Sequence, residues 1–174
     1  MAPARKTGKS RPMRRALLPV VLGIAAVGCA RPPRPLAGEF PPVSVRDAQR
    51  DPPTGTTVRW GGTLVRTTPT NDGRTCFEVV SRPLDRRARP TTSDESAGRF
   101  VACAPAFYDP DVYAPGREVT FVGTLDGTTT RPVGEVDYTF PVVDARVVHL
   151  WEPRPVYPAS GPRFGISIGG VFGF

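Results

Sequence analysis

The sequence has 174 residues and a formal net charge of +7, with 23 lysines and arginines against 16 aspartates and glutamates. Six of the cations lie within the first 15 residues, so a chain cut after residue 28 keeps 17 arginines, no lysine and a net charge near +1. This removes the main argument for a nucleic-acid partner, and we expect none. The 146 residues that follow residue 28 suit one domain with a hydrophobic core.

The N-terminal segment 1–28 has the parts of an export signal. Its first 15 residues are basic and hold no acidic residue, and the apolar run that follows, Ala16 to Gly28, is 13 residues long. A membrane-spanning helix needs about 20 apolar residues, whereas the apolar part of a signal peptide has roughly 7 to 15. We therefore predict a signal peptide over residues 1–28 that is removed after export.

A cysteine directly follows this apolar run. The segment Ala26-Val27-Gly28-Cys29 resembles the lipobox of bacterial lipoproteins, with alanine where leucine is usual. In such proteins the cysteine is acylated and becomes the new N-terminus, and three acyl chains anchor it far more firmly than one. We expect lipidation at Cys29, with an ordinary secreted protein as the alternative. Ala30 is not the aspartate that typically retains such lipoproteins in the inner membrane, which favours the outer membrane.

Proline dominates the next segment, with seven prolines between Arg31 and Thr57. This composition is typical of a stiff spacer. We predict that residues 29–56 are the lipidated cysteine followed by a proline-rich tether that lifts the domain off the membrane. Phe40 and Val43 are the side chains that can dock on the domain.

Residues 57–152 alternate between apolar and polar with period two, and proline or glycine interrupts every window long enough for a helix. In the stretch VRWGGTLV the residues that share one face are Val58, Trp60, Gly62 and Leu64. The other predicted strands are 75–81, 99–104, 117–126 and 140–151.

The first and fourth strands repeat the pattern V-x-aromatic-x-G-T-L, at 58–64 and 119–125. A glycine inside a strand usually marks a bulge or a sharp bend, such as the corner of a small closed barrel. Five long, bent strands therefore predict an all-β fold, a small OB-like antiparallel barrel, with a β-sandwich as the alternative. Only Val122 breaks the alternation of the fourth strand. In the fifth strand the apolar residues in phase are Val143, Ala145, Val147 and Trp151.

Two thiols remain once Cys29 is acylated, those of Cys76 and Cys103. In the oxidising compartment of an exported protein we expect them to form a disulfide, which would stabilise the fold by about 3 kcal/mol. Two buried, unpaired cysteines are the alternative. We expect no metal, because His149 has no partner at a ligand spacing.

Groups for catalysis are scarce in this chain. It has one histidine, no lysine after the signal peptide and no Gly-x-Ser-x-Gly sequence, so we expect neither enzymatic activity nor a cofactor. His149 is expected to pack beside Trp151. Asp109 and Asp111 lie two apart between prolines, where a turn is favoured over a cation site.

A ligand face is the remaining candidate site. Trp60 and Trp151 could form an aromatic platform for a sugar on the barrel face, with an anion contacted by Arg86 and Arg87 of the cluster Arg82–Arg89. We favour core packing for the tryptophans and a solvated loop for the arginines over this ligand face.

The C-terminal segment 153–174 is rich in proline and glycine, and its end alternates bulky and small residues. One such strand cannot close a membrane barrel. We favour a mobile tail, or a tail that binds another envelope protein by adding a strand to it, over a membrane strand. A strand added to the edge of the barrel is the alternative.

The predicted domain contains, in this order, VRWGGTL, FEVVSRPLD, SAGRFVA, FYDPDVYAPGREVTFVGTLDG and GEVDYTFPVV. Together with the lipidated cysteine, these segments resemble the Slp family of Gram-negative outer-membrane lipoproteins, the starvation-inducible type, from about Thr57 to Trp151. The resemblance implies an outer-membrane protein with a role in starvation or envelope stress. We expect its domain to face the periplasm. It implies no catalytic residue and no ligand. The cysteine pair and the glycine-rich tail are not part of the family pattern.

Overall fold

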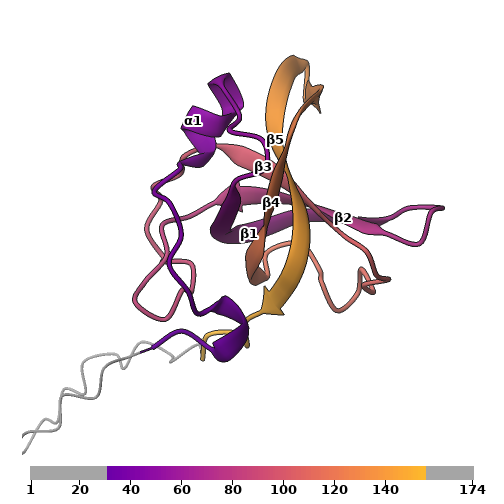
Figure 1. The fold of residues 1–174 in the computed structure, drawn as a ribbon. Coiled ribbons are helices and arrows are strands. Elements are labelled where there is room, and N and C mark those ends of the chain that lie inside the picture. The colour runs from indigo at the N-terminus through magenta and orange to yellow at the C-terminus, as the bar shows by residue number, and fades with distance from the viewer. Residues whose placement is uncertain (1–30, 156–174) are drawn as a thin grey trace, which may run out of the picture.

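Five strands and two short helical segments make up the computed structural model, which describes residues 31–155 (Figure 1). In chain order the elements are η1 (Arg34–Leu36), α1 (Val45–Arg50), β1 (Thr57–Pro69), β2 (Thr75–Ser81), β3 (Arg99–Ala104), β4 (Glu118–Val133) and β5 (Val136–Leu150). The predicted signal peptide, Cys29 and residues 156–174 of the predicted tail lie outside the described residues. Between residues 31 and 155 no helix has the length and the apolar character needed to cross a membrane.

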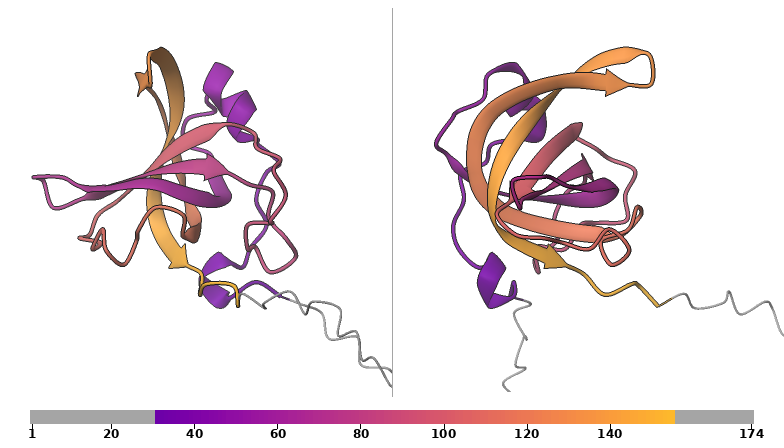
Figure 2. Two further views of the ribbon diagram at one scale, coloured as in Figure 1. Left: turned by 180° about the vertical axis from the view of Figure 1, so that it is seen from behind. Right: turned by 90° about the vertical axis from the view of Figure 1, so that its right-hand side faces the viewer.

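The strands close into a barrel in the order β1-β2-β3-β5-β4, which confirms the all-β, OB-like barrel over the sandwich (Figures 1 and 2). The expectation that every pair is antiparallel is wrong at one position. β3 and β5 run parallel, with partners from Val101↔Val142 to Cys103↔Asp144. A closed ring with an odd number of strands cannot alternate direction throughout, so one neighbouring pair has to be parallel.

Two glycines allow the strands to approach closely. β1 pairs with β4 up to Thr63 and with β2 from Gly62 onward, so Gly62 lies where the strand changes partner. A Cβ on Gly62 would lie 1.9 Å from the carbonyl oxygen of Val80. A Cβ on Gly123 would lie 2.3 Å from that of Asp144, and the β4–β5 register shifts beside it. Both repeated glycines thus lie at close approaches of neighbouring strands, and Gly123 lies beside a register shift, as the sequence predicts for a bulge.

The barrel interior is filled by alternate residues of all five strands. Trp60 is only 8% exposed and packs edge-on against Phe100, with ring centroids 5.4 Å apart. Val45 and Ala48 of α1 also belong to this core. The largest fully buried side chains include Phe77, Phe100, Phe121, Phe140, Leu64 and Leu125. Each such side chain stabilises the fold by about 1.5–3 kcal/mol.

A second apolar cluster lies outside the barrel, on β4 and β5. Its buried members are Leu36, Ala88 and Val122. Val122, which breaks the alternation, is therefore buried on the outer face of β4. Val147 and Trp151 also join this outer cluster, so the prediction that they are in phase with Val143 and Ala145 is wrong. In the β4–β5 pairing Val122 lies opposite Val147 and Gly123 lies opposite Ala145, so Arg146 has no partner. This extra residue reverses which face of β5 the residues after it occupy.

The segment expected as a free tether is docked on the barrel. Ser44 caps α1 by accepting a hydrogen bond from the Asp47 backbone N–H at 3.1 Å. The Trp60 indole donates to the Val43 carbonyl at 2.8 Å, and Arg59 donates to the Leu36 carbonyl at 2.7 Å. Apolar burial and these hydrogen bonds correct the tether prediction for residues 34–51. Phe40 and Val43 dock, as the sequence allowed.

Candidate functional site

Cys76 and Cys103 lie opposite each other on β2 and β3. Their sulfurs are joined, with an S–S distance of 2.06 Å and Cα atoms 4.0 Å apart. In this state neither sulfur is available as a nucleophile or as a metal ligand. The pair therefore links two neighbouring strands of the barrel.

His149 packs against Trp151, with ring centroids 4.4 Å apart and the rings nearly perpendicular. Burial lowers the pKa of His149 below its ordinary value, because desolvation disfavours the charged imidazolium. The Trp151 indole donates to the Thr120 hydroxyl at 2.9 Å. These contacts are the packing role that the sequence predicts for His149.

The possible ligand face is not assembled in the described residues. Trp60 lies in the barrel core with its N–H bound to Val43, whereas Trp151 lies in the outer cluster. The two indoles therefore do not share a platform, because the register shift in β5 places Trp151 on the outside of the barrel. Arg86 and Arg87 are exposed on the loop between β2 and β3, which is the solvated position favoured for them above.

A groove of about 850 Å³ lies beside Trp60. It is lined by residues 40–47 of the docked segment, residues 59–61 of β1, and residues 81–84 and 95–97. The guanidinium groups of Arg46, Arg59 and Arg82 line it, and each donates to a backbone carbonyl at 2.7–3.2 Å. The groove thus places Trp60 and Leu84 beside three arginines with fixed guanidinium groups, and Asp47 and Glu95 also line it.

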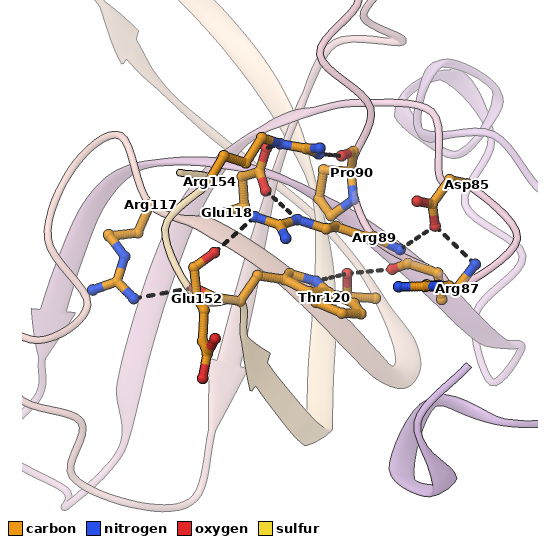
Figure 3. A network of polar contacts seen from close by, with 11 residues as sticks. Asp85, Arg87, Arg89, Pro90, Arg117, Glu118, Thr120, Glu152 and Arg154 are labelled. Atoms are coloured by element: carbon orange, nitrogen blue, oxygen red, sulfur yellow. Dashed lines mark hydrogen bonds and ion pairs between the residues drawn. The ribbon is translucent and has the colours of Figure 1, made fainter. Parts of the chain in front are cut away.

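A network of arginines and one glutamate holds the end of the described chain (Figure 3). The Glu118 carboxylate accepts from Arg89 Nε at 2.6 Å and from Arg154 Nε at 2.8 Å. Arg89 also donates to the Glu152 carbonyl at 2.7 Å, and Arg154 to the Pro90 carbonyl at 2.6 Å. The Glu118 side chain is only 19% exposed, so these charge-assisted bonds are screened less than bonds between fully exposed groups.

The loop Leu84–Pro90 is rigidly held beside this network. The Asp85 carboxylate accepts from the backbone N–H groups of Arg87 and Arg89 at 2.8 and 2.9 Å. Ala88 has a positive φ of 64°, is fully buried, and its carbonyl accepts from the Thr120 hydroxyl at 2.7 Å. Arg86 and Arg87 are therefore exposed on a fixed backbone, and Figure 3 shows the bonds to Asp85 that hold it.

Both ends of the described chain meet this loop. Leu36 of η1 packs on Ala88, and Arg154 bonds to Pro90. We call the surface formed by residues 31–37, the loop Leu84–Pro90 and residues 152–155 the exit face. It lies at the lower end of the molecule in Figures 1 and 2, while α1 and the β4–β5 turn lie at the upper end.

Sequence reasoning missed Glu118, Arg154 and the positive φ of Ala88. An Asx-turn signal at Asp85, three residues before Ala88, was available in the sequence. The partners of Glu118 are 29 and 36 residues away in the chain and leave no local pattern. Asp109 accepts from the Asp111 backbone N–H at 2.9 Å, as expected for a turn. Among residues 31–155, no three His, Cys, Asp or Glu side chains gather as a metal site.

The family model of the outer membrane lipoprotein Slp family matches residues 26–166. The chain is 34% identical to a Haemophilus influenzae protein over 134 residues, which is 75% of this chain and 72% of that protein. It is 33% identical to the lipoprotein YeaY of Escherichia coli over 112 residues, 60% of this chain and 57% of YeaY. It is 30% identical to the outer membrane protein Slp of Escherichia coli over 104 residues, 59% of this chain and 53% of Slp.

The matches to the two Escherichia coli proteins thus span little more than half the length of each. Among solved structures, a small single-stranded DNA-binding protein from Streptomyces coelicolor aligns with a TM-score of 0.36 and 18% identity. The alignment covers 55% of this chain and 94% of that one. This likeness is too weak to bear on function. The family match, in contrast, covers most of the sequence, and the chain belongs to the Slp family of outer membrane lipoproteins.

Proposed function

We propose that the protein is a non-enzymatic lipoprotein, anchored in the outer membrane by acyl chains on Cys29, that holds its barrel close to the periplasmic leaflet. The observation that carries this proposal is the docking of η1. Cys29 precedes the buried Leu36 by seven positions, so the chain between them spans at most about 25 Å. An anchor at Cys29 then keeps the barrel at the membrane surface instead of lifting it away.

The chemistry of the described residues supports a role without catalysis. The His149 imidazole is packed against Trp151, and the sulfurs of Cys76 and Cys103 are bonded to each other. The polar network around Glu118 binds the chain to itself and leaves no free base at its centre. We infer a structural role in the envelope, and the resemblance to starvation-inducible members extends the proposal to envelope integrity under stress.

Metabolic labelling with palmitate tests the anchor. We expect the wild-type protein to be labelled and to fractionate with the outer membrane, and Cys29→Ala to lose the label. Ala30→Asp is the matched control, because it should keep the label but move to the inner membrane fraction. Equal labelling of the wild type and Cys29→Ala would contradict the proposal.

The groove beside Trp60 supports a second candidate, the binding of a glycan or an anionic ligand. Its volume of about 850 Å³ lies within the roughly 300–1,000 Å³ of small-molecule sites, and three guanidinium groups line it. Binding to a glycan array should fall when Arg46 and Arg82 are changed to alanine. The exposed Arg50 at the end of α1 provides the control substitution, Arg50→Ala. Binding that survives the loss of Arg46 and Arg82 would remove this assignment.

A further inference from the structure

We propose that the exit face is the surface with which the barrel rests on the membrane, and that Arg34, Arg86 and Arg87 bind the phosphates of anionic phospholipids there. This inference rests on the acyl anchor proposed above. It extends that proposal from an anchored chain to a domain with a fixed orientation.

The length of chain before η1 determines which surface lies nearest the lipid. Cys29 is five positions from Arg34, so the acylated residue is at most about 18 Å from the start of η1. η1 itself cannot swing away freely, because Leu36 is fully buried against the outer cluster and its carbonyl accepts from Arg59. The acyl chains therefore enter the bilayer beside the exit face and far from α1.

The arginines on this face are available for a ligand. Arg34, Arg86 and Arg87 are exposed, and their guanidinium groups take part in none of the ion pairs or hydrogen bonds found within residues 31–155. A guanidinium presents paired N–H donors that match two phosphate oxygens, so phospholipid headgroups are suitable partners.

Two of the four carboxylates on or beside this face are engaged. Asp85 accepts two backbone N–H bonds, and Glu118 is shared by Arg89 and Arg154. Glu39 and Glu152 are exposed without such partners in the described part of the chain. These two negative charges are outnumbered by four exposed arginines, which are Arg31 and the three proposed phosphate ligands. The face therefore keeps a positive excess.

A second group of exposed arginines provides an internal comparison. Arg66 and Arg131 line a smaller hollow near the end of the β4–β5 hairpin, beside Arg99, which is paired with Glu78 at 2.7 Å. The β4–β5 turn and α1 lie at the opposite end of the molecule from η1 (Figures 1 and 2). Attraction to a charged leaflet extends only about a Debye length, roughly 8 Å at physiological salt. Arginines at the upper end should therefore stay in water when the exit face meets the headgroups.

Arginine footprinting of the acylated full chain tests the orientation. The protein, extracted from membranes, is reconstituted into vesicles of phosphatidylcholine alone or with added phosphatidylglycerol, and its arginines are modified with phenylglyoxal and quantified by mass spectrometry. With phosphatidylglycerol we expect Arg34, Arg86 and Arg87 to react about fivefold more slowly than with phosphatidylcholine alone. Arg50 and Arg131 should react equally in both, and high salt should abolish the protection.

Charge variants then test whether the protection depends on these side chains. The double substitution Arg86→Gln with Arg87→Gln should return the reaction of Arg34 toward its rate in phosphatidylcholine. The matched pair Arg50→Gln with Arg66→Gln, which removes the same charge elsewhere, should leave Arg34 protected.

The outcomes separate this inference from the anchor. If the protein floats with both kinds of vesicle but its exit-face arginines react equally in both, the orientation is overturned and the anchor stands. Protection of Arg50, Arg66 and Arg131 in place of the exit face overturns the orientation as well. Failure of the acylated protein to float with either vesicle contradicts the anchor, and the orientation that depends on it.

Discussion

The first half of strand β4, residues 119–125, is buried on both faces, but different parts of the chain cover them. Val119, Phe121 and Leu125 point into the barrel, where the other strands cover them. Val122 points outward and is covered by Leu36 and Ala88, which belong to segments without regular strand character. The inner face is thus required for the barrel to close, and the outer face fixes where the two ends of the described chain leave it.

This difference predicts two kinds of response to mutation. A substitution at a position where two barrel strands come into close contact should unfold the whole domain, because every strand depends on the closed ring. A change in the outer cluster should release the docked segment while the barrel persists. The following predictions test this distinction, from the largest expected effect to the smallest.

Gly62→Ala should have the largest effect. The new Cβ would lie 1.9 Å from the Val80 carbonyl oxygen, so the backbone of β2 has to move. We expect the free energy of unfolding to fall by more than about 4 kcal/mol, a large part of the roughly 5–15 kcal/mol that is typical of a folded domain. Chemical denaturation followed by circular dichroism measures this change.

Gly127→Ala is the matched control for Gly62→Ala. Gly127 has a φ of +91° and no atom within 4 Å of a new Cβ, so the cost is backbone strain alone, about 1–2 kcal/mol. Equal destabilisation by the two substitutions would show that the close approach at Gly62 does not hold the barrel.

Loss of the disulfide should have the next largest effect. Cys76 and Cys103 are 27 positions apart, and a cross-link over that length stabilises the folded state by about 3.5 kcal/mol through the entropy of the unfolded chain. A reductant should lower the urea midpoint of the wild type by a corresponding amount. It should not change the midpoint of a variant with both cysteines replaced by serine, and an unchanged wild type would contradict the prediction.

Leu36→Ala tests the outer cluster. Truncating this fully buried side chain should weaken the docking of η1 by about 2–3 kcal/mol. We expect faster hydrogen exchange in residues 34–50 and unchanged exchange in the five strands. The exposed Pro35 provides a control, Pro35→Ala. A uniform increase of exchange across β1 to β5 would show that the outer cluster supports the barrel itself.

The barrel could be predicted from the sequence because its inward-facing residues follow the alternation of apolar and polar residues along the chain. β2 and β3 have the predicted bounds, Thr75–Ser81 and Arg99–Ala104. The docking of η1 was not readable, since Leu36 is a single apolar residue among prolines and its partners are distant in the chain. The phase reversal in β5 was also hidden, because a bulge does not interrupt the apolar pattern around it.

The candidate site was less predictable than the fold for the same reason. The groove and the exit face both form where the docked segment contacts loops. Such contacts between distant parts of the chain produce no periodic pattern in the sequence. Trp60 and Trp151 look equivalent in the sequence, yet only Trp60 points into the barrel. Arg86 and Arg87 were expected in a solvated loop, and their fixed position follows from bonds made by Asp85.

His149 should produce the smallest effect, as a pH dependence of the outer surface. Its pKa in the folded state is lowered by desolvation beside Trp151, so the unfolded chain, with a pKa near 6.5, binds the proton first as the pH falls. Above about pH 6.5 His149 is neutral in both the folded and the unfolded state. The protonation of His149 should therefore not change the free energy of unfolding in that range. It should decrease below that value and level off once the pH is under the folded pKa.

His149→Gln isolates this dependence, because His149 is the only histidine in the sequence. The urea midpoint is plotted against pH for the wild type and the variant. Above about pH 6.5 the difference between the two midpoints should be constant, and below that pH the wild type should lose more stability. Carboxylates that titrate at lower pH contribute to both proteins and cancel in the difference. Parallel curves would mean that packing against Trp151 does not disfavour the imidazolium. The imidazole would then be in effective contact with water, and the outer face of β5 would be more open than its contacts indicate.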